Sequence, residues 1–215
     1  MVDMRVCLAS TSPARLMLLR QAGIEPLTLS PDVDEDAVAA AAAAERGAEL
    51  PPTELVLLLA RAKAADVAHR LAAEGGFDGL VIGGDSMFAL GGRVYGKPYT
   101  AEEAIRRWRE MRGATGILHS GHSVYRVSPG VAPTEATAVA EASVTFADDI
   151  TDAEIADYVA TGEPLHVAGA FTVDSLGGAF ITRVDGDPST VVGMSLSTVR
   201  RLAAELGVPW TSLWS

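Results

Sequence analysis

The sequence predicts an α/β fold with a central mixed β-sheet flanked by helices, and three observations lead to this prediction. Short apolar runs typical of buried strands alternate along the 215 residues with stretches whose apolar residues recur at helical spacing. Glycine-containing turns connect several strands directly, so the sheet should hold antiparallel as well as parallel pairs. No internal repeat and no proline- or serine-rich linker divides the chain, and we therefore expect a single domain over residues 1–215.

The first half of the chain is expected to begin with a buried strand over Met4–Ala9. The helix after it has Ser12 as N-cap and Pro13 at its first position, and Gly23 ends it. Ala37–Ala44 is nearly all alanine and is either a peripheral helix or a tolerant connection. The elements expected next are a helix over Glu54–Ala73, a strand over Leu80–Ile82 that ends at Gly83-Gly84, and two short strands on either side of Gly91-Gly92.

The second half of the chain is expected to add two capped helices and an antiparallel strand pair. Capping-box patterns at Thr100–Glu103 and Thr151–Glu154 each predict a helix start. Thr115–Val127 and Glu135–Phe146 are rich in β-forming residues and are joined at Ser128-Pro129-Gly130, as in a hairpin. The remaining predicted elements are strands over Gly169–Asp174 and Ala179–Val184 and a last helix over Ser197–Leu206.

Composition restricts the classes of function. The net charge of −11 argues against nonspecific binding to a nucleic-acid polymer, and a polyanionic substrate would need local positive charge. The single cysteine, Cys7, excludes an intrachain disulfide and a cysteine-rich metal site, and its apolar surroundings predict a small buried side chain. The sequence shows no secretion signal and no apolar run long enough for a membrane span, so we expect a cytoplasmic enzyme or binding protein.

The stretch Leu80–Pro98 carries an acid and a base on one glycine-hinged hairpin. Asp85 follows a buried apolar strand, and the carboxyl ends of such strands are where open α/β sheets bind ligands. Lys97 lies in a Gly-Lys-Pro sequence farther along the same hairpin. Two interpretations stay open on these residues alone: a ligand site, or an ordinary hairpin with a turn aspartate and a solvated lysine.

The segment Ser10–Arg15 is a candidate phosphate site because hydroxyl groups and a helix N-terminus coincide there. A positive charge in the first turn of a helix opposes the helix dipole, so Arg15 makes more sense if it reaches an anion. The alternative is a surface arginine on an ordinary capped helix. The acidic run Ser30–Asp36 is by default a solvated loop or cap, and otherwise one of its carboxylates helps to hold a divalent ion or its water.

Three further side chains are expected to have ordinary structural roles on the sequence alone. Lys63 lies toward the edge of the apolar face of its helix, where a lone lysine is usually solvated. His119 and His122 share one predicted strand, but no third ligand lies at a suggestive spacing. We therefore expect hydrogen-bonded structural histidines rather than a zinc site.

Taken together and in order, nine short motifs from residue 8 to residue 193 resemble the Maf family of nucleoside triphosphate pyrophosphatases, which has the inosine-triphosphatase-like fold. The motifs are Leu8–Arg15, Val33–Glu35, Ala62–Ala64, Ile82–Ser86, Gly96–Pro98, Ser120–His122, Gly162–Pro164, Ala168–Phe171 and Val191–Gly193.

The resemblance assigns roles to the matching positions. It implies that Asp85 is the catalytic proton acceptor, and that Asp85 and Glu35 bind a metal ion or position its water. The residues that it implies for binding phosphate and substrate are Ser10, Ser12, Arg15, Lys63 and Lys97. The implied reaction is hydrolysis of a nucleoside triphosphate to the monophosphate and pyrophosphate with Mg²⁺ or Mn²⁺.

Three positions depart from the two subgroups that the chain resembles. These are Ala14, Ser86 and Asp174. The dTTP- and UTP-hydrolysing group has Arg, Thr and Gln there, and the group acting on 7-methyl-GTP has Trp, Gln and Glu. We expect these positions to determine which base is accepted, and the sequence predicts no base preference.

The resemblance also completes the predicted architecture and function. It implies an elongated sheet with a nucleotide cleft between two lobes, walled by Leu80–Pro98 and Ser10–Arg15, and it allows a homodimer. The function expected is the clearing of noncanonical or surplus nucleotides. The alternative is a nucleotide-sensing regulator of septum formation, in which binding rather than turnover matters. A phosphatase with an aspartyl nucleophile would need a D-x-D motif after a strand, which the sequence lacks.

Overall fold

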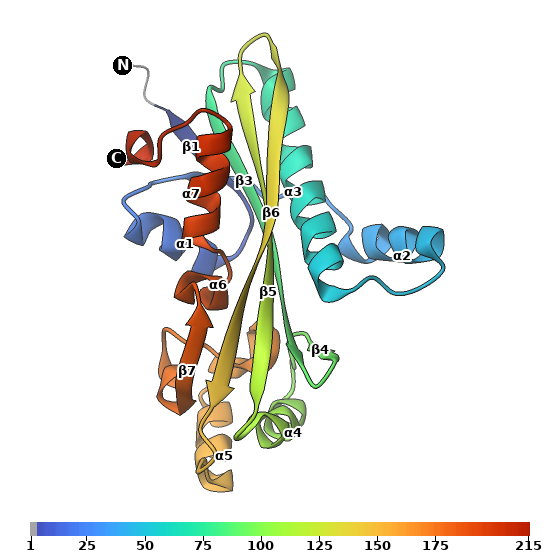
Figure 1. Ribbon diagram of the computed structural model, residues 1–215, viewed down its shortest axis with the longest axis vertical. Helices are drawn as coiled ribbons and strands as arrows, with labels where there is room; N and C mark the ends of the chain where they lie inside the picture. Colours follow the sequence, from blue (N-terminus) through green and yellow to red (C-terminus); the bar gives the residue numbers. More distant parts are fainter. Residues whose placement is uncertain (1–3) are drawn as a thin grey trace. The chain divides into compact units, whose positions relative to one another are not determined.

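The computed structural model describes residues 4–215 and confirms the α/β class with one mixed sheet (Figure 1). Seven strands of the described residues form this sheet in the order β2-β1-β3-β5-β6-β7, with β4 paired to β3. The strands are β1 (Arg5–Ala9), β2 (Leu27–Thr28), β3 (Gly79–Leu90), β4 (Arg93–Tyr95), β5 (Thr115–Ser128), β6 (Val131–Phe146) and β7 (Ile181–Gly186). The α-helices are α1 (Pro13–Gln21), α2 (Glu35–Arg46), α3 (Pro52–Glu74), α4 (Ala101–Met111), α5 (Asp152–Ala160), α6 (Pro188–Val192) and α7 (Leu196–Glu205).

The chain divides into two compact units. Unit 1 comprises the described residues of Met1–Asp85 together with Ser120–Ala140 and Gly193–Ser215, and unit 2 comprises Ser86–His119 and Glu141–Val192. The long strands β3, β5 and β6 each contribute residues to both units. The predicted cleft between two lobes of a single domain stays a prediction.

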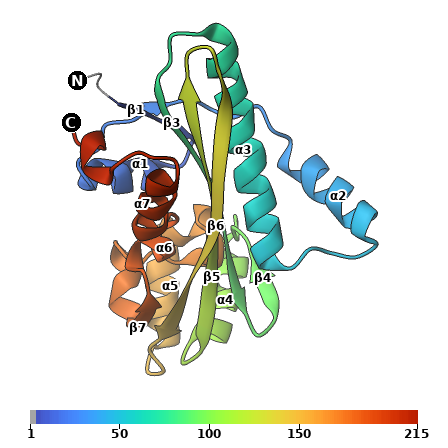
Figure 2. The ribbon, with the colours of Figure 1, turned by 45° about the horizontal axis from the view of Figure 1, so that its top comes forward.

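In unit 1 the sheet is covered on both faces (Figures 1 and 2). Strand β1 pairs in parallel with both β2 and β3, and Cys7 lies opposite Val81. Cys7 and Ala9 point toward α3, and the twofold period of a strand therefore turns Leu8 to the face that carries α1 and α7. The buried residues between α3 and the sheet are Cys7, Ala9, Ala64, Val67, Ala68, Phe77, Val81, Tyr125 and Val127.

Two glycines allow α3 to lie unusually close to the sheet. A β-carbon on Gly83 would be 2.6 Å from the Ala60 carbonyl oxygen, and one on Gly121 would be 2.2 Å from the Val56 carbonyl oxygen. Only glycine fits at such distances from another backbone. The predicted end of the strand at Gly83-Gly84 is wrong, because β3 continues through both residues as far as Leu90. Gly83 allows helix α3 to approach the strand rather than making a turn.

Helix α2 contains the alanine-rich stretch and decides between its two interpretations. It is a peripheral helix without a single buried residue, and Figures 1 and 2 show it beside α3 and away from the strands. The Asp34 side chain caps it by accepting a hydrogen bond from the Ala37 amide at 3.0 Å. Within the acidic run, Asp34 is therefore a cap, as the default interpretation expects.

Unit 2 is built around a cluster of aromatic rings. Trp108 on α4 meets Phe146 and Tyr158 edge-to-face, with ring centroids 5.5 and 5.1 Å apart. Its indole N–H donates to the Ala170 carbonyl at 2.8 Å. The predicted capping box of α5 is complete at Thr151, whereas the Thr100 cap of α4 is one-sided, because the carboxylate of its third residue pairs with two arginines instead.

The predicted strand over Gly169–Asp174 is wrong. A 3₁₀ turn covers Ala168–Ala170, with positive φ angles of 76° at Gly169 and 61° at Ala170, and another covers Leu176–Phe180. A chain with such angles cannot enter a β-ladder. Strand β7 begins only at Ile181 and runs antiparallel to β6.

Among residues 4–215 we find no helix that is both long enough and apolar enough to cross a membrane.

Candidate functional site

Three of the predicted site residues meet in unit 1 around one ammonium group. The Lys63 Nζ atom lies 2.7 Å from Oδ1 of Asp85 and 2.9 Å from Oε1 of Glu35. Lys63 is on α3, Asp85 is on β3 and Glu35 is the first residue of α2, so the contact joins three elements. Asp85 and Lys63 are buried, whereas half of the Glu35 side chain is exposed. The solvated-lysine interpretation of Lys63 is therefore wrong.

The electrostatics of this cluster favour a proton acceptor. Burial raises the pKa of Asp85 above its ordinary value of 3.8, and Glu35 acts in the same direction. Lys63 and Arg15 oppose the increase, but burial outweighs them. A carboxylate whose pKa is raised holds a proton more firmly, which is the property that a general base requires.

The loop before α1 has the predicted cap and an additional hydroxyl contact. The Ser12 hydroxyl accepts a hydrogen bond from the Arg15 amide at 3.4 Å, which makes Ser12 the N-cap. The Ser10 hydroxyl oxygen accepts bonds from the Ser12 amide at 3.1 Å and from Nη1 of Arg15 at 3.3 Å. The hydroxyl groups and the helix start thus lie together, as a phosphate cradle requires.

Arg15 is buried, so its interpretation as a surface arginine is wrong. Its Nε atom donates to the Gly193 carbonyl at 2.8 Å. Burial lowers the pKa of Arg15, and the charges of Asp85 and Glu35 act against this decrease. A buried guanidinium in the electrostatic field of two carboxylates belongs to the same charged cluster as Lys63. The Val191–Gly193 motif marked this position, but nothing in it indicated a contact with Arg15, because a backbone carbonyl can belong to any residue.

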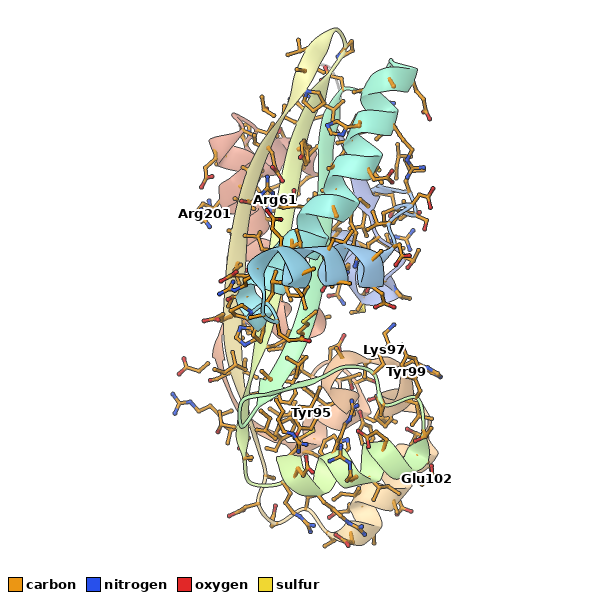
Figure 3. All side chains as sticks on the ribbon, turned by 90° about the vertical axis from the view of Figure 1, so that its right-hand side faces the viewer. Arg61, Tyr95, Lys97, Tyr99, Glu102 and Arg201 are labelled. Carbon is orange, nitrogen blue, oxygen red and sulfur yellow. The ribbon has the colours of Figure 1, made fainter. Side chains whose placement is uncertain are left out.

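Four predicted site residues remain, one in unit 1 and three in unit 2. Ala14 is a half-buried residue of α1, and Ser86, Lys97 and Asp174 belong to unit 2. Figure 3 shows Lys97 next to Tyr99 on the segment between β4 and α4, with the lysine side chain directed away from that helix. That Ser86, Lys97 and Asp174 share a site with the residues of unit 1 stays a prediction.

The loop that carries Asp174 is held by a residue to which the sequence assigned no role, Glu163. Its carboxylate accepts hydrogen bonds from five donors in unit 2. These donors are the hydroxyls of Tyr158, Thr172 and Ser175 and the amides of Leu176 and Gly177. The Gly-Glu-Pro motif marked the position, but nothing in the sequence indicated that the donors would converge.

The two histidines are hydrogen-bonded structural residues, as expected. His119 Nδ1 lies 2.7 Å from Oε1 of Glu141, and His122 Nε2 accepts a hydrogen bond from the Ser195 amide at 2.9 Å. Cys7 is fully buried, and burial raises the pKa of its thiol to about 11, as expected for an unreactive cysteine.

The donor set at Lys63 fits a divalent ion that binds together with a substrate. No three His, Cys, Asp or Glu residues of the described chain come together as a metal-binding group. Asp85 and Glu35 nevertheless converge on one cation, the Lys63 ammonium. Mg²⁺ in enzymes is commonly held by one or two carboxylates and completed by substrate phosphates and water. Two carboxylates therefore suffice for an ion of this kind.

The Glu163 contacts predict a pH-dependent stability. Burial would raise the pKa of this carboxyl, but the hydrogen bonds from Thr172, Ser175, Gly177 and Tyr158 lower it from 4.5 to about 2. The folded state therefore gains stability above pH 4.5, and this gain is lost as the pH falls toward 2. We expect Glu163→Gln to lower the free energy of unfolding at pH 7 by about 1.5–3 kcal/mol.

Urea unfolding of Glu163→Gln and the unsubstituted protein at several pH values measures both effects. The difference in stability between them should shrink below pH 4.5. A difference that is independent of pH would contradict the role of the ionised carboxylate.

Comparison with known proteins identifies the family of this chain. The family model described as Maf-like protein matches residues 5–206. A protein of Leifsonia xyli subsp. xyli named nucleoside triphosphate pyrophosphatase is 58% identical, with 99% of this chain and 97% of that protein covered. Proteins with the same name from Rhodococcus jostii and Salinispora tropica are 50% and 51% identical, covering 97% and 100% of this chain and 95% and 89% of their own.

Likeness to solved structures is weak. A nucleoside-triphosphatase, dITP/XTP pyrophosphatase, of Mycobacterium abscessus aligns over 95% of this chain and 97% of its own with 11% identity and a TM-score of 0.34, too low to add to the description of the fold. The match to the family is a match of sequence and covers most of the length of this chain. The chain belongs to the Maf-like protein family.

Proposed function

We propose that this protein hydrolyses nucleoside triphosphates at the α-phosphate, producing a nucleoside monophosphate and pyrophosphate. The observation that carries the proposal is the buried Asp85 carboxylate, which has a raised pKa and lies 2.7 Å from the Lys63 ammonium. Relatives up to 58% identical over nearly their whole length are named nucleoside triphosphate pyrophosphatase, which supports this reaction class.

In the proposed step, Asp85 acts as the general base. It takes a proton from a water molecule whose oxygen forms a bond to the α-phosphorus. The bond from the α-phosphorus to the bridging oxygen breaks, and pyrophosphate leaves with the electron pair. Ionised Asp85 is required at the start of the step, and the neighbouring Lys63 ammonium favours this ionised form, opposing part of the effect of burial.

The cations of unit 1 would stabilise the charge that develops during this step. Negative charge builds up on the oxygens around phosphorus and on the departing pyrophosphate, so catalysis depends mainly on positioning and charge. Arg15, Lys63 and the N-terminus of α1 supply positive potential in a protein with a net charge of −11. Ser10 and Ser12 would bind phosphate oxygens beside them, and Lys97 would add a further phosphate contact.

A divalent ion, Mg²⁺ or Mn²⁺, is part of the proposal. Asp85 and Glu35 would hold it. When bound, it would neutralise negative charge on the phosphate oxygens. Glu35 then has a second role, because its half-exposed carboxylate can exchange the Lys63 contact for the ion without a buried charge losing its partner.

Substrate choice and cellular context extend the proposal. Ala14, Ser86 and Asp174 would determine which base is accepted, and the small side chain of Ala14 leaves room where other subgroups have Arg or Trp. The cellular role would be to remove noncanonical or surplus nucleotides. A cytoplasmic location and a homodimer stay predictions.

The alternative of a nucleotide-sensing regulator is not favoured. A module that only binds nucleotides has no need of a buried base, and here Asp85 and Glu35 both contact Lys63. The names of the relatives also describe an enzyme.

A product assay over a panel of nucleoside triphosphates tests the reaction class. With Mg²⁺ or Mn²⁺ present, we expect pyrophosphate and nucleoside monophosphate in equal amounts, measured by chromatography and a pyrophosphate assay. Inorganic phosphate together with nucleoside diphosphate would contradict the proposal, and so would no turnover of any member of the panel.

Substitution of Asp85 tests the base. We expect Asp85→Asn to lower kcat by about 10²–10⁴-fold while the protein stays folded. In the unsubstituted enzyme, kcat/KM should fall as the pH decreases through the pKa of Asp85, which lies above 3.8. Asp157→Asn, at an exposed position of α5, is the matched control and should leave the rates unchanged. Near-normal turnover by Asp85→Asn would place the base elsewhere.

A further inference from the structure

The segment Gly193–Ser195, which leads into α7, is tied to two other elements of unit 1. The Gly193 carbonyl accepts hydrogen bonds from Nε of Arg15 at 2.8 Å and from the Ser120 hydroxyl at 3.3 Å. Two residues later, the Ser195 amide donates to Nε2 of His122 at 2.9 Å. Ser120 and His122 lie on β5 and Arg15 lies on α1, so this short segment connects the strand to the helix.

The orientation of Arg15 depends on where the Gly193 carbonyl is. Nε lies in the rigid plane of the guanidinium group, so a hydrogen bond at Nε fixes the direction of the whole plane. The contact from Nη1 to the Ser10 hydroxyl is longer, at 3.3 Å. A shift of the Gly193 carbonyl would therefore turn the guanidinium away from the direction in which it now points.

The position of that carbonyl depends in turn on His122. A backbone N–H can only donate, so Nε2 of His122 must be the unprotonated acceptor nitrogen. His122 and Ser195 are both fully buried, and water therefore cannot replace the imidazole as acceptor. Loss of this acceptor removes a hydrogen bond that fixes the Ser195 amide, and a displaced Ser195 backbone would displace the nearby Gly193 carbonyl.

We infer that His122 is a positioning residue for phosphate recognition. Its Nε2 atom fixes the Gly193–Ser195 segment, and the Gly193 carbonyl then holds the Arg15 guanidinium in the orientation that binds phosphate. The inference rests on the proposed function, because it takes Arg15 to be a phosphate contact.

Two amide substitutions test the inference because their side-chain oxygens extend to different distances from the backbone. The side-chain oxygen of His122→Gln can replace Nε2 as the acceptor, whereas His122→Asn is one methylene shorter and cannot. The probe is inorganic tripolyphosphate, which has no base, and its binding to the full chain is measured by calorimetry. We expect His122→Asn to weaken binding about tenfold, equal to about 1.4 kcal/mol, and His122→Gln to stay within roughly twofold.

A double-mutant cycle with Arg15→Met separates positioning from general destabilisation. If His122 acts through Arg15, His122→Asn should cause no further loss of affinity in the Arg15→Met background. The matched control is His119→Asn, which changes another buried, hydrogen-bonded histidine of β5 and should leave tripolyphosphate binding unchanged. If His122→Asn does not fold, His122→Leu takes its place, since it fills the buried position without an acceptor.

Three results would overturn the inference: equal binding by His122→Asn and the unsubstituted protein, additive losses in the cycle, or no binding of tripolyphosphate by the unsubstituted protein. Failure of the proposed function can be distinguished from failure of this inference. If the proposed function is wrong, no pyrophosphate is released, but the calorimetric cycle still measures the coupling between His122 and Arg15.

Discussion

The buried ion pair between Lys63 and Asp85 is the interaction on which the rest of the site depends. Placing two charges in a protein interior costs several kcal/mol for each ion, and loss of one partner typically destabilises a protein by about 3–5 kcal/mol. The pair at 2.7 Å exists because α3 lies close to the sheet, and the helix can lie there because Gly83 and Gly121 have no side chains. The close packing of α3 on the sheet thus makes the ion pair possible, and the ion pair contains the proposed catalytic base.

The second constraint is the orientation of Arg15. In a protein with a net charge of −11, the few buried cations determine where an anion can bind. Lys63 is oriented by carboxylates, whereas Arg15 is oriented by the Gly193 carbonyl and by the Ser10 hydroxyl. The two cations therefore differ: a metal ion or substrate can displace the carboxylate contacts of Lys63, whereas the Gly193 contact of Arg15 is to the backbone of unit 1.

Local signals in the sequence predicted the elements of the fold well but not its long-range contacts. The Ser12 cap, the helix over Glu54–Ala73 and the strand pair around Ser128–Gly130 follow from residue type and spacing, and the structure confirms them. The strand through Gly83 was missed because it depends on the close approach of an earlier helix, α3. The irregular chain over Gly169–Asp174 was missed because it depends on positive φ angles at Gly169 and Ala170 and on the hydrogen bond from Thr172 to Glu163. Considered on its helix alone, Lys63 was expected to be solvated, since its partners come from β3 and α2.

Attack of water on the α-phosphorus, with Asp85 as the base, is the step on which the proposed function depends. Hydrolysis in water labelled with ¹⁸O, followed by mass spectrometry of both products, tests this most directly. The account predicts that the label appears in the nucleoside monophosphate and not in pyrophosphate, and that Asp85→Asn loses this labelled product. Label in the pyrophosphate would show attack at the β-phosphorus and would contradict the account.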